Sequence, residues 1–196
     1  MYQLVIVRKD LNMSTGKVAA QVSHASMAFL TNKLRQNGRR LWKYKVLPTN
    51  RPYLRADICR LAEEARQKGM DYFSIKPIDT DKPYGEMELC ENEYDNYSCD
   101  ITIDKETYEE WVLGSFTKII CEAKNKNKLL KAVKIAESLG LQEGIDFFLI
   151  KDNCLTELEP EEIGEDGIGR TLTCIGFRPL DNETAHKISK NYQLYK

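Results

Sequence analysis

Three polar side chains of different chemistry recur along one face of a predicted helix near the start of the chain. Lys17, Gln21 and His24 stand four and then three positions apart, which places them in one row on a helix. A cation, an amide and an imidazole in such a row can bind a phosphate or polarise a carbonyl group. An ordinary polar flank with a surface histidine has the same spacing, and the pattern alone favours that plainer interpretation.

A carboxylate far along the chain is predicted to face this row. Asp152 directly follows the apolar segment 147–150, which has the length and composition of a buried strand. If this strand ends at the same sheet edge as the first strand, Asp152 comes close to Lys17. The carboxylate can then orient or deprotonate a water molecule, and the lysine can stabilise the charge that develops on an attacked carbonyl. Without such a partner, an Asp-Asn pair is typical of a turn.

The elements that position Lys17 are a strand and the helix that follows it. Residues 2–8 are apolar and rich in β-branched side chains, which predicts a buried strand. A helix over 15–35 is predicted to begin at a hydroxyl cap, Ser14 or Thr15. A lysine in the first turn opposes the helix dipole, so Lys17 does not serve helix stability.

Several runs of residues resemble one known family. The sequence VIVRKDLNM at 5–13, followed by GKVAAQVSHA at 16–25, resembles the opening of the type 2 peptidyl-tRNA hydrolases. The resemblance resumes at Trp111 and extends to about Pro179. Its later segments are individually weaker, but they follow in the family's order: 116–120, 136–141, 149–152 with Thr156, and 171–176.

This resemblance implies an activity and a set of site residues. The family hydrolyses the ester that joins a peptide to the 3′ ribose of tRNA, without a metal ion or cofactor. The family's catalytic positions match Lys17, Asp152, Thr156 and Thr173. The hydroxyls of the two threonines would position water or the carbonyl. Gln21, His24 and Arg8 are expected to bind substrate, with His24 near the site rather than acting as the base.

The resemblance also implies the architecture. Strands that alternate with helices indicate an α/β fold, and the family has a three-layer sandwich with a four-stranded mixed sheet and helices on both faces. Residues 1–35 and 104–196 are expected to form this domain. Residues 36–103 depart from the family and are expected to be an inserted α+β segment, which could clamp nucleic acid, contact proteins, or simply be an ordered decoration.

Two departures from the family pattern keep a second function open. The family's Asp is followed by Ala-Gly-Arg, whereas Asn153, Cys154 and Leu155 stand here, so an arginine that could touch phosphate is missing. The loop from Thr156 to Thr173 is also longer and acidic, and such a loop would repel a tRNA backbone unless it folds away. The alternative is a non-catalytic module that binds RNA or protein with the same fold.

Net charge gives no global sign of nucleic-acid binding, since the chain carries a formal charge of −1. Local clusters are therefore the candidates. Residues 36–56 hold six basic residues and no acid, and Lys124, Lys126 and Lys128 lie before and within the first turn of a helix predicted over 127–139. Helix stability does not explain these lysines, so we expect them to contact tRNA; a solvated basic face is the plain alternative.

Composition limits the remaining possibilities. The sequence has no run of about 18 apolar residues that would span a membrane, and its start is unlike a signal peptide. Its six cysteines form no zinc-binding spacing, and free thiols are typical of a reducing cytosol. We therefore expect a cytoplasmic protein, and the resemblance implies an enzyme that acts on tRNA carrying a peptide. The family resemblance further implies a homodimer.

Overall fold

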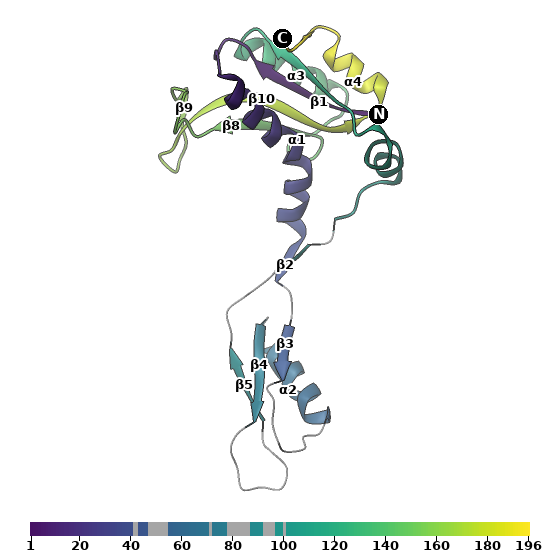
Figure 1. Ribbon diagram of the computed structural model, residues 1–196, viewed down its shortest axis with the longest axis vertical. Helices are drawn as coiled ribbons and strands as arrows, with labels where there is room; N and C mark the ends of the chain where they lie inside the picture. The colour runs from purple at the N-terminus through teal and green to yellow at the C-terminus, as the bar shows by residue number, and fades with distance from the viewer. Residues whose placement is uncertain (41–42, 47–54, 71, 78–86, 92–96, 100) are drawn as a thin grey trace. The chain divides into compact units, whose positions relative to one another are not determined.

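The chain forms two compact units in a computed structural model that describes residues 1–40, 43–46, 55–70, 72–77, 87–91, 97–99 and 101–196 (Figure 1). The first unit combines Met1–Gln36 with Ile101–Lys196, and the second is Asn37–Asp100. The first unit carries the candidate site, because all the predicted site residues belong to it.

A six-stranded mixed sheet forms the centre of the first unit. In sheet order its strands are β11 (Gln193–Leu194), β7 (Lys118–Ala123), β1 (Tyr2–Arg8), β10 (Gly169–Leu180) and β8 (Phe147–Asp152), with β9 (Glu162–Ile163) paired to β10. Strand β1 runs parallel to β7 and antiparallel to β10, and β8 pairs antiparallel with β10. The predicted α/β class is confirmed.

The predicted number of four strands is wrong. The four long strands are present, but β9 and β11 add two residues each. Segments of two residues are too short to carry an apolar alternation, so periodicity could not reveal them. Pairing to β10 and β7 is what holds these two short strands in the sheet.

Helices cover both faces of this sheet, because residues of β1 alternate between two cores (Figure 1). Val5 and Val7 pack with Ala25 of α1 (Thr15–Asn37). Leu4 and Ile6 face the other way and belong to the larger core. That core includes side chains of α3 (Lys126–Ser138) and α4 (Asn182–Ser189).

Helix α1 lies unusually close to the sheet at one glycine. A Cβ atom on Gly176 of β10 would lie 2.3 Å from the carbonyl oxygen of Ala25. Further along, Phe29 packs edge-on against the buried Trp111, with ring centroids 5.9 Å apart. Trp111 belongs to η1 (Thr107–Ser115), a π-helix. These two contacts fix the height of α1 above the sheet.

The described residues of the second unit form one helix and two small sheets. Its elements are β2 (Gly38–Arg40), β3 (Lys43–Val46), α2 (Arg55–Gln67), β4 (Tyr72–Pro77), β5 (Met87–Glu91) and β6 (Tyr97–Cys99). Strand β2 pairs antiparallel with β6, and β3, β4 and β5 form the other sheet. Apolar residues of α2 pack with Ile75 of β4.

Candidate active site

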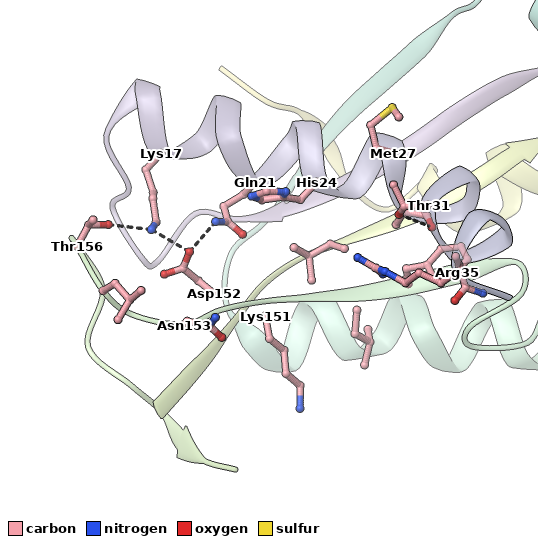
Figure 2. Close-up of a pocket in the computed structure, with 16 residues that line it drawn as sticks. Lys17, Gln21, His24, Met27, Thr31, Arg35, Lys151, Asp152, Asn153 and Thr156 are labelled. Atoms are coloured by element: carbon pink, nitrogen blue, oxygen red, sulfur yellow. Dashed lines mark hydrogen bonds and ion pairs between the residues drawn. The ribbon is translucent and has the colours of Figure 1, made fainter. Parts of the chain in front are cut away.

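The predicted proximity of Lys17 and Asp152 is confirmed. Lys17 Nζ lies 2.8 Å from Asp152 Oδ2, and the two side chains are only 13% and 12% exposed. Lys17 Nζ also donates a 2.9 Å hydrogen bond to the hydroxyl of Thr156. Figure 2 shows the lysine between these two partners, with α1 on one side and the end of β8 on the other. The ammonium group is therefore held in place by two separate segments of chain.

Gln21 is the second side chain of α1 that contacts the Asp152 carboxylate. Its side-chain nitrogen donates a 2.7 Å hydrogen bond to Asp152 Oδ2, the oxygen that Lys17 also contacts. Lys17 and Gln21 are one helical turn apart on α1, which is why both reach the same oxygen. Because the Gln21 amide is buried, its position is fixed by protein contacts rather than by solvent.

Thr173 lies behind Gln21 and does not line the open site. Its hydroxyl is buried and lies 2.7 Å from Gln21 Oε1 and 3.0 Å from the carbonyl oxygen of Ile150. The expectation that this hydroxyl positions water or the substrate carbonyl directly does not fit this placement. Its contact with Gln21 instead sets the orientation of the amide that faces Asp152.

The environment of Asp152 favours its charged form. Partial burial acts to raise the pKa of Asp152, but hydrogen bonds from Lys17, the Cys154 N–H and Gln21 outweigh it. The net pKa lies below the usual value for an aspartate. The N–H of Cys154 contributes a 2.9 Å bond to Oδ1. Asp152 is therefore anionic at neutral pH.

The turn after Asp152 contains one of the departures from the family sequence. Cys154 has a φ of 54°, a left-handed conformation that glycine adopts at least cost. The resemblance places glycine at this position, which suits a left-handed backbone, whereas the residue with this conformation here is a cysteine. This shape is what directs the Cys154 N–H at the carboxylate.

A groove of about 640 Å³ extends from these residues along the sheet edge (Figure 2). One side of it is formed by α1, and its lining residues there are Lys17, Gln21, His24, Met27, Ala28, Thr31, Asn32 and Arg35. Residues 148–153 of β8 and the following turn form the other side, with Leu155 and Thr156 at one end. His24 thus lies where the sequence placed it, next to Gln21 and facing the groove.

Leu155 occupies the place of the missing family arginine. Its side chain is 86% exposed and lines the end of the groove near Thr156. An apolar side chain in this position cannot attract phosphate. The groove therefore has an apolar side chain where the family resemblance places an arginine.

Acidic residues of the loop after Thr156 are paired with groups of the protein itself. Glu157 accepts hydrogen bonds from the backbone N–H and the hydroxyl of Ser14, at the start of α1. Further pairs join Glu162 to Lys151 and Asp166 to Arg170. These contacts offset the repulsion that the sequence predicted between this loop and a tRNA backbone.

Arg8 lies outside the groove, in contrast to its expected role in substrate binding. Its side chain is 3% exposed and pairs with Asp10 and with Glu161 at 2.6 Å. It also donates to the carbonyl oxygen of Leu172. These bonds hold the pKa of Glu161 at about 2, with the Arg8 contact as the largest cause. Arg8 therefore ties the acidic loop to the sheet.

The lysines before and within α3 also lie away from the groove, because α3 and α1 cover opposite faces of the sheet. Lys126 pairs with Glu161 at 2.9 Å, and Lys128 lies over the ring of Tyr192. Lys124 is exposed. The other basic cluster, within 36–56, lies outside the residues whose side chains are described.

The family model for peptidyl-tRNA hydrolase PTH2 matches residues 1–81 and 87–195. The chain belongs to this family. The match includes most of the stretch 36–103, for which the sequence motifs gave no resemblance to PTH2 enzymes. Lys17 and Asp152 both lie within the matched residues.

Three archaeal proteins named peptidyl-tRNA hydrolase are similar to this PTH2 chain. That of Methanopyrus kandleri is 25% identical over 195 residues, covering 99% of this chain and 97% of the relative. That of Sulfolobus acidocaldarius is 22% identical over 194 residues, covering 99% of both. That of Thermoplasma acidophilum is 26% identical over 92 residues, covering 47% of this chain and 68% of the relative. The similarity is low in identity but extends along the chain.

Two functional contacts could not be found from the sequence. Glu157 was grouped with an acidic loop, yet it binds the start of α1 next to Lys17. Thr173 was assigned to the site by family resemblance, yet its contact is with Gln21. Both contacts join residues more than 140 positions apart, so no local pattern could indicate them.

Proposed function

We propose that this chain hydrolyses the ester between a peptide and the 3′ ribose of tRNA, with Lys17 and Asp152 at the reacting centre. The single observation that carries the proposal is the 2.8 Å contact between these two side chains at one end of an open groove. A PTH2 chain with this pair in contact has both an anion to organise water and a cation to stabilise an oxyanion.

The attacking group in this proposal is a water molecule held by Asp152. The oxygen of the water forms a bond to the ester carbonyl carbon, and the bond between that carbon and the ribose oxygen breaks. One proton of the water passes to the ribose oxygen, and the other is released as the carboxylic acid ionises. The products are free tRNA with a 3′ or 2′ hydroxyl and a peptide with a free carboxylate. Because the pKa of Asp152 is lowered, the carboxylate is a weak base, and orienting the water is its larger contribution.

Lys17 has two roles in this scheme. Its positive charge stabilises the negative charge that develops on the carbonyl oxygen during attack. Its contact with Asp152 also keeps that carboxylate ionised. Thr156 orients the lysine through its 2.9 Å hydrogen bond, and Gln21 fixes the carboxylate from the opposite side.

Contacts with the tRNA body are assigned to cations outside the groove. Lys124, Lys126 and Lys128 are proposed to contact phosphates, as the sequence suggested, with Lys124 the most accessible of them. Lys126 already pairs with Glu161, so a phosphate would compete with this carboxylate for the ammonium group. A homodimer and a cytoplasmic location are part of the same proposal, by analogy with the family. No helix among the described residues is long and apolar enough to cross a membrane.

A second candidate function rests on Leu155. An exposed leucine where the family has an arginine favours a protein that uses the fold to bind RNA or protein without catalysis. The two functions differ in one measurable respect. A binding module would retain tRNA without cleaving the ester.

Substitution of Asp152 by Asn tests the proposed function. Asn keeps the shape of the side chain but loses the charge, so single-turnover cleavage of N-acetyl-aminoacyl-tRNA should fall about a hundredfold or more. Affinity for tRNA at fixed salt should change little or increase, because a negative charge is removed. Asp166→Asn is the matched control, since Asp166 pairs with Arg170 outside the groove. Cleavage by Asp152→Asn within about threefold of the parent would contradict the mechanism, and tRNA binding without cleavage by the parent would establish the binding module.

A further inference from the structure

Strand β8 lies at the edge of the sheet, and its free edge borders the groove. In the sheet order β8 pairs with β10 on one side only. Six consecutive residues, 148–153, line the groove along this edge. An edge strand carries backbone N–H and C=O groups that can pair with another extended chain. The groove therefore includes a surface with the hydrogen-bonding pattern of a sheet.

Hydrogen bonds at two positions show which residues of β8 direct their backbone outward. The carbonyl of Ile150 faces β10, because the buried hydroxyl of Thr173 lies 3.0 Å from it. The carbonyl of Phe147 faces the other way, because it accepts from the N–H of Gly144. Since backbone direction alternates along a strand, Leu149 and Lys151 face outward like Phe147. Among the described residues, no side-chain or loop hydrogen bond reaches the backbone groups of these two residues.

Helix α1 forms a wall beside this edge. The helix residues that line the groove recur every three or four positions from Lys17 to Arg35, with neighbouring pairs at 27–28 and 31–32 (Figure 2), and form a row about 27 Å long. The side chains of Phe148 and Ile150 lie on the same face of β8 as Asp152. They give the groove an apolar floor next to the reacting pair. From Asp152 to Phe148 the strand extends about 13 Å, room for about four extended residues.

We propose that the peptide part of peptidyl-tRNA binds in this groove as an extra strand along the free edge of β8. This inference rests on the proposed function, because the ester must lie at Lys17 and Asp152. The ester is at the carboxyl end of the peptide, so the peptide runs toward Asp152 in the same direction as β8. Backbone groups of Leu149 and Lys151 then pair with every second peptide residue, in the parallel arrangement.

Main-chain pairing suits a hydrolase whose peptide substrates vary in sequence. The hydrogen bonds would be made by backbone groups that every residue carries, except that proline has no N–H. Side chains of the peptide would alternate between Met27 and Ala28 on the α1 side and solvent on the other. The enzyme would therefore depend on the length of the peptide more than on its sequence.

The 3′ end of tRNA fits this edge less well than a peptide does. Carbonyl oxygens of Leu149 and Lys151 need hydrogen-bond donors, and phosphate groups offer only acceptors at neutral pH. The one cation on this edge, Lys151, already pairs with Glu162 at 2.5 Å. The floor beneath the edge is apolar. These features favour a peptide chain over a nucleic-acid strand.

Substrate length and backbone methylation test the inference. The substrates are N-acetyl-aminoacyl-tRNA and N-acetyl-tetrapeptidyl-tRNA with the same tRNA and the same esterified residue. We expect the longer substrate to have a kcat/KM higher by about tenfold, as two or more net hydrogen bonds would give. Methylation of one peptide N–H group at a time should remove this gain at every second residue and leave it unchanged at the residues between them. An absent length effect, or equal effects of methylation at neighbouring residues, would overturn the inference.

Two variants of Lys151 locate the effect on β8. Lys151→Pro removes the outward N–H, which an edge strand tolerates, and should abolish the preference for the longer substrate. Lys151→Ala removes the same side chain and its ion pair but keeps the N–H, and should keep the preference. The measured quantity is the ratio of kcat/KM for the two substrates within each variant, so changes common to both substrates cancel. Equal ratios in the two variants would contradict the role of this edge.

Hydrogen exchange separates this inference from the proposed function. A non-cleavable tetrapeptidyl-tRNA analogue, with an amide in place of the ester, should protect the amides of Leu149 and Lys151 in the unmodified protein. If no ester is cleaved but this protection occurs, the hydrolase proposal fails and the peptide site stands. If cleavage occurs and these amides stay unprotected, or if a deacylated CCA oligonucleotide protects them equally, the groove does not hold the peptide as a strand.

Discussion

The buried hydroxyl of Thr173 lies 2.7 Å from Oε1 of Gln21. This contact leaves the amide nitrogen of Gln21 directed at Asp152, to which it donates a 2.7 Å hydrogen bond. Thr173 therefore acts on the carboxylate through another side chain. Its influence on catalysis should be one of positioning rather than contact with substrate.

Substitution of Thr173 by Val tests this positioning. Val has a similar shape but no hydroxyl, so Gln21 loses one partner and its amide can turn away from Asp152. We expect kcat to fall about tenfold with a small change in KM, because the substrate does not contact Thr173. Thr173→Ser keeps the hydroxyl and should retain most of the activity. A variant pair in which Ser and Val behave alike would show that packing, not the hydrogen bond, matters here.

Lys17→Met should separate catalysis from stability. Removal of the cation should lower kcat about a hundredfold, since it takes away oxyanion stabilisation. The fold should tolerate the change, because a lysine in the first turn opposes the helix dipole and Asp152 keeps its bonds to Gln21 and the Cys154 N–H. Ester cleavage and thermal melting measure the two effects. A lower melting temperature with unchanged cleavage would show that Lys17 is structural.

Glu161→Gln should reduce stability in a pH-dependent way. Glu161 bridges Arg8 and Lys126, and these contacts hold its pKa at about 2, below the unfolded value. A carboxylate with a lowered pKa stabilises the fold above its unfolded pKa, and this contribution is lost as pH falls through the folded pKa. The variant should therefore lose about 2 kcal/mol of unfolding free energy at pH 7. Denaturant unfolding at several pH values should show the difference shrink between about pH 4.5 and pH 2; a constant difference would contradict the assignment.

Cys154→Gly should stabilise the protein. A residue with a side chain pays a steric cost at a φ of 54°, and glycine does not. We expect a gain of about 1 kcal/mol in unfolding free energy, partly offset by the greater chain entropy of glycine. Cleavage activity should persist, because the N–H that binds Asp152 remains. Destabilisation would indicate that the cysteine side chain makes a contact of larger value than the strain.

Replacement of 38–100 by a short Gly/Ser link should leave a folded first unit. Neither of its two core clusters contains a residue of this segment. Gly38 and Cys99 are paired across β2 and β6, so a link need span only a short distance. Circular dichroism and ester cleavage measure the result. A deletion variant without cooperative melting would show that the inserted segment contributes to the core.

The sequence was most informative where a single chain segment determines the structure. The strand at 2–8 has the predicted bounds and the helix begins at Thr15 as predicted, because an apolar, β-branched run and a hydroxyl cap are local features. The helix ends at Asn37, two residues beyond the predicted end. The proximity of Lys17 and Asp152 was also predictable, since both lie at one edge of an α/β sheet.

The sequence was least informative where distant segments meet. The family resemblance suggested a substrate contact for Arg8. Its side chain is instead buried against Glu161, 153 positions away. Pairing of two residues in β9 with β10 likewise depends on how the acidic loop returns to the sheet. Such contacts are set by tertiary packing, which no local pattern records.

The close approach of α1 to the sheet at Gly176 limits which mutations this enzyme can accept. A methyl group at Gly176 would meet the Ala25 carbonyl oxygen at 2.3 Å, so even alanine must push the helix outward. Lys17 and Gln21 belong to that helix, while Asp152 and Thr173 belong to the sheet and the turn beside it. An increase in their separation would lengthen together the contacts that Lys17 and Gln21 make with Asp152, Thr156 and Thr173. One buried position that never meets substrate therefore sets the spacing on which turnover depends, and a screen for inactive yet folded variants should find it.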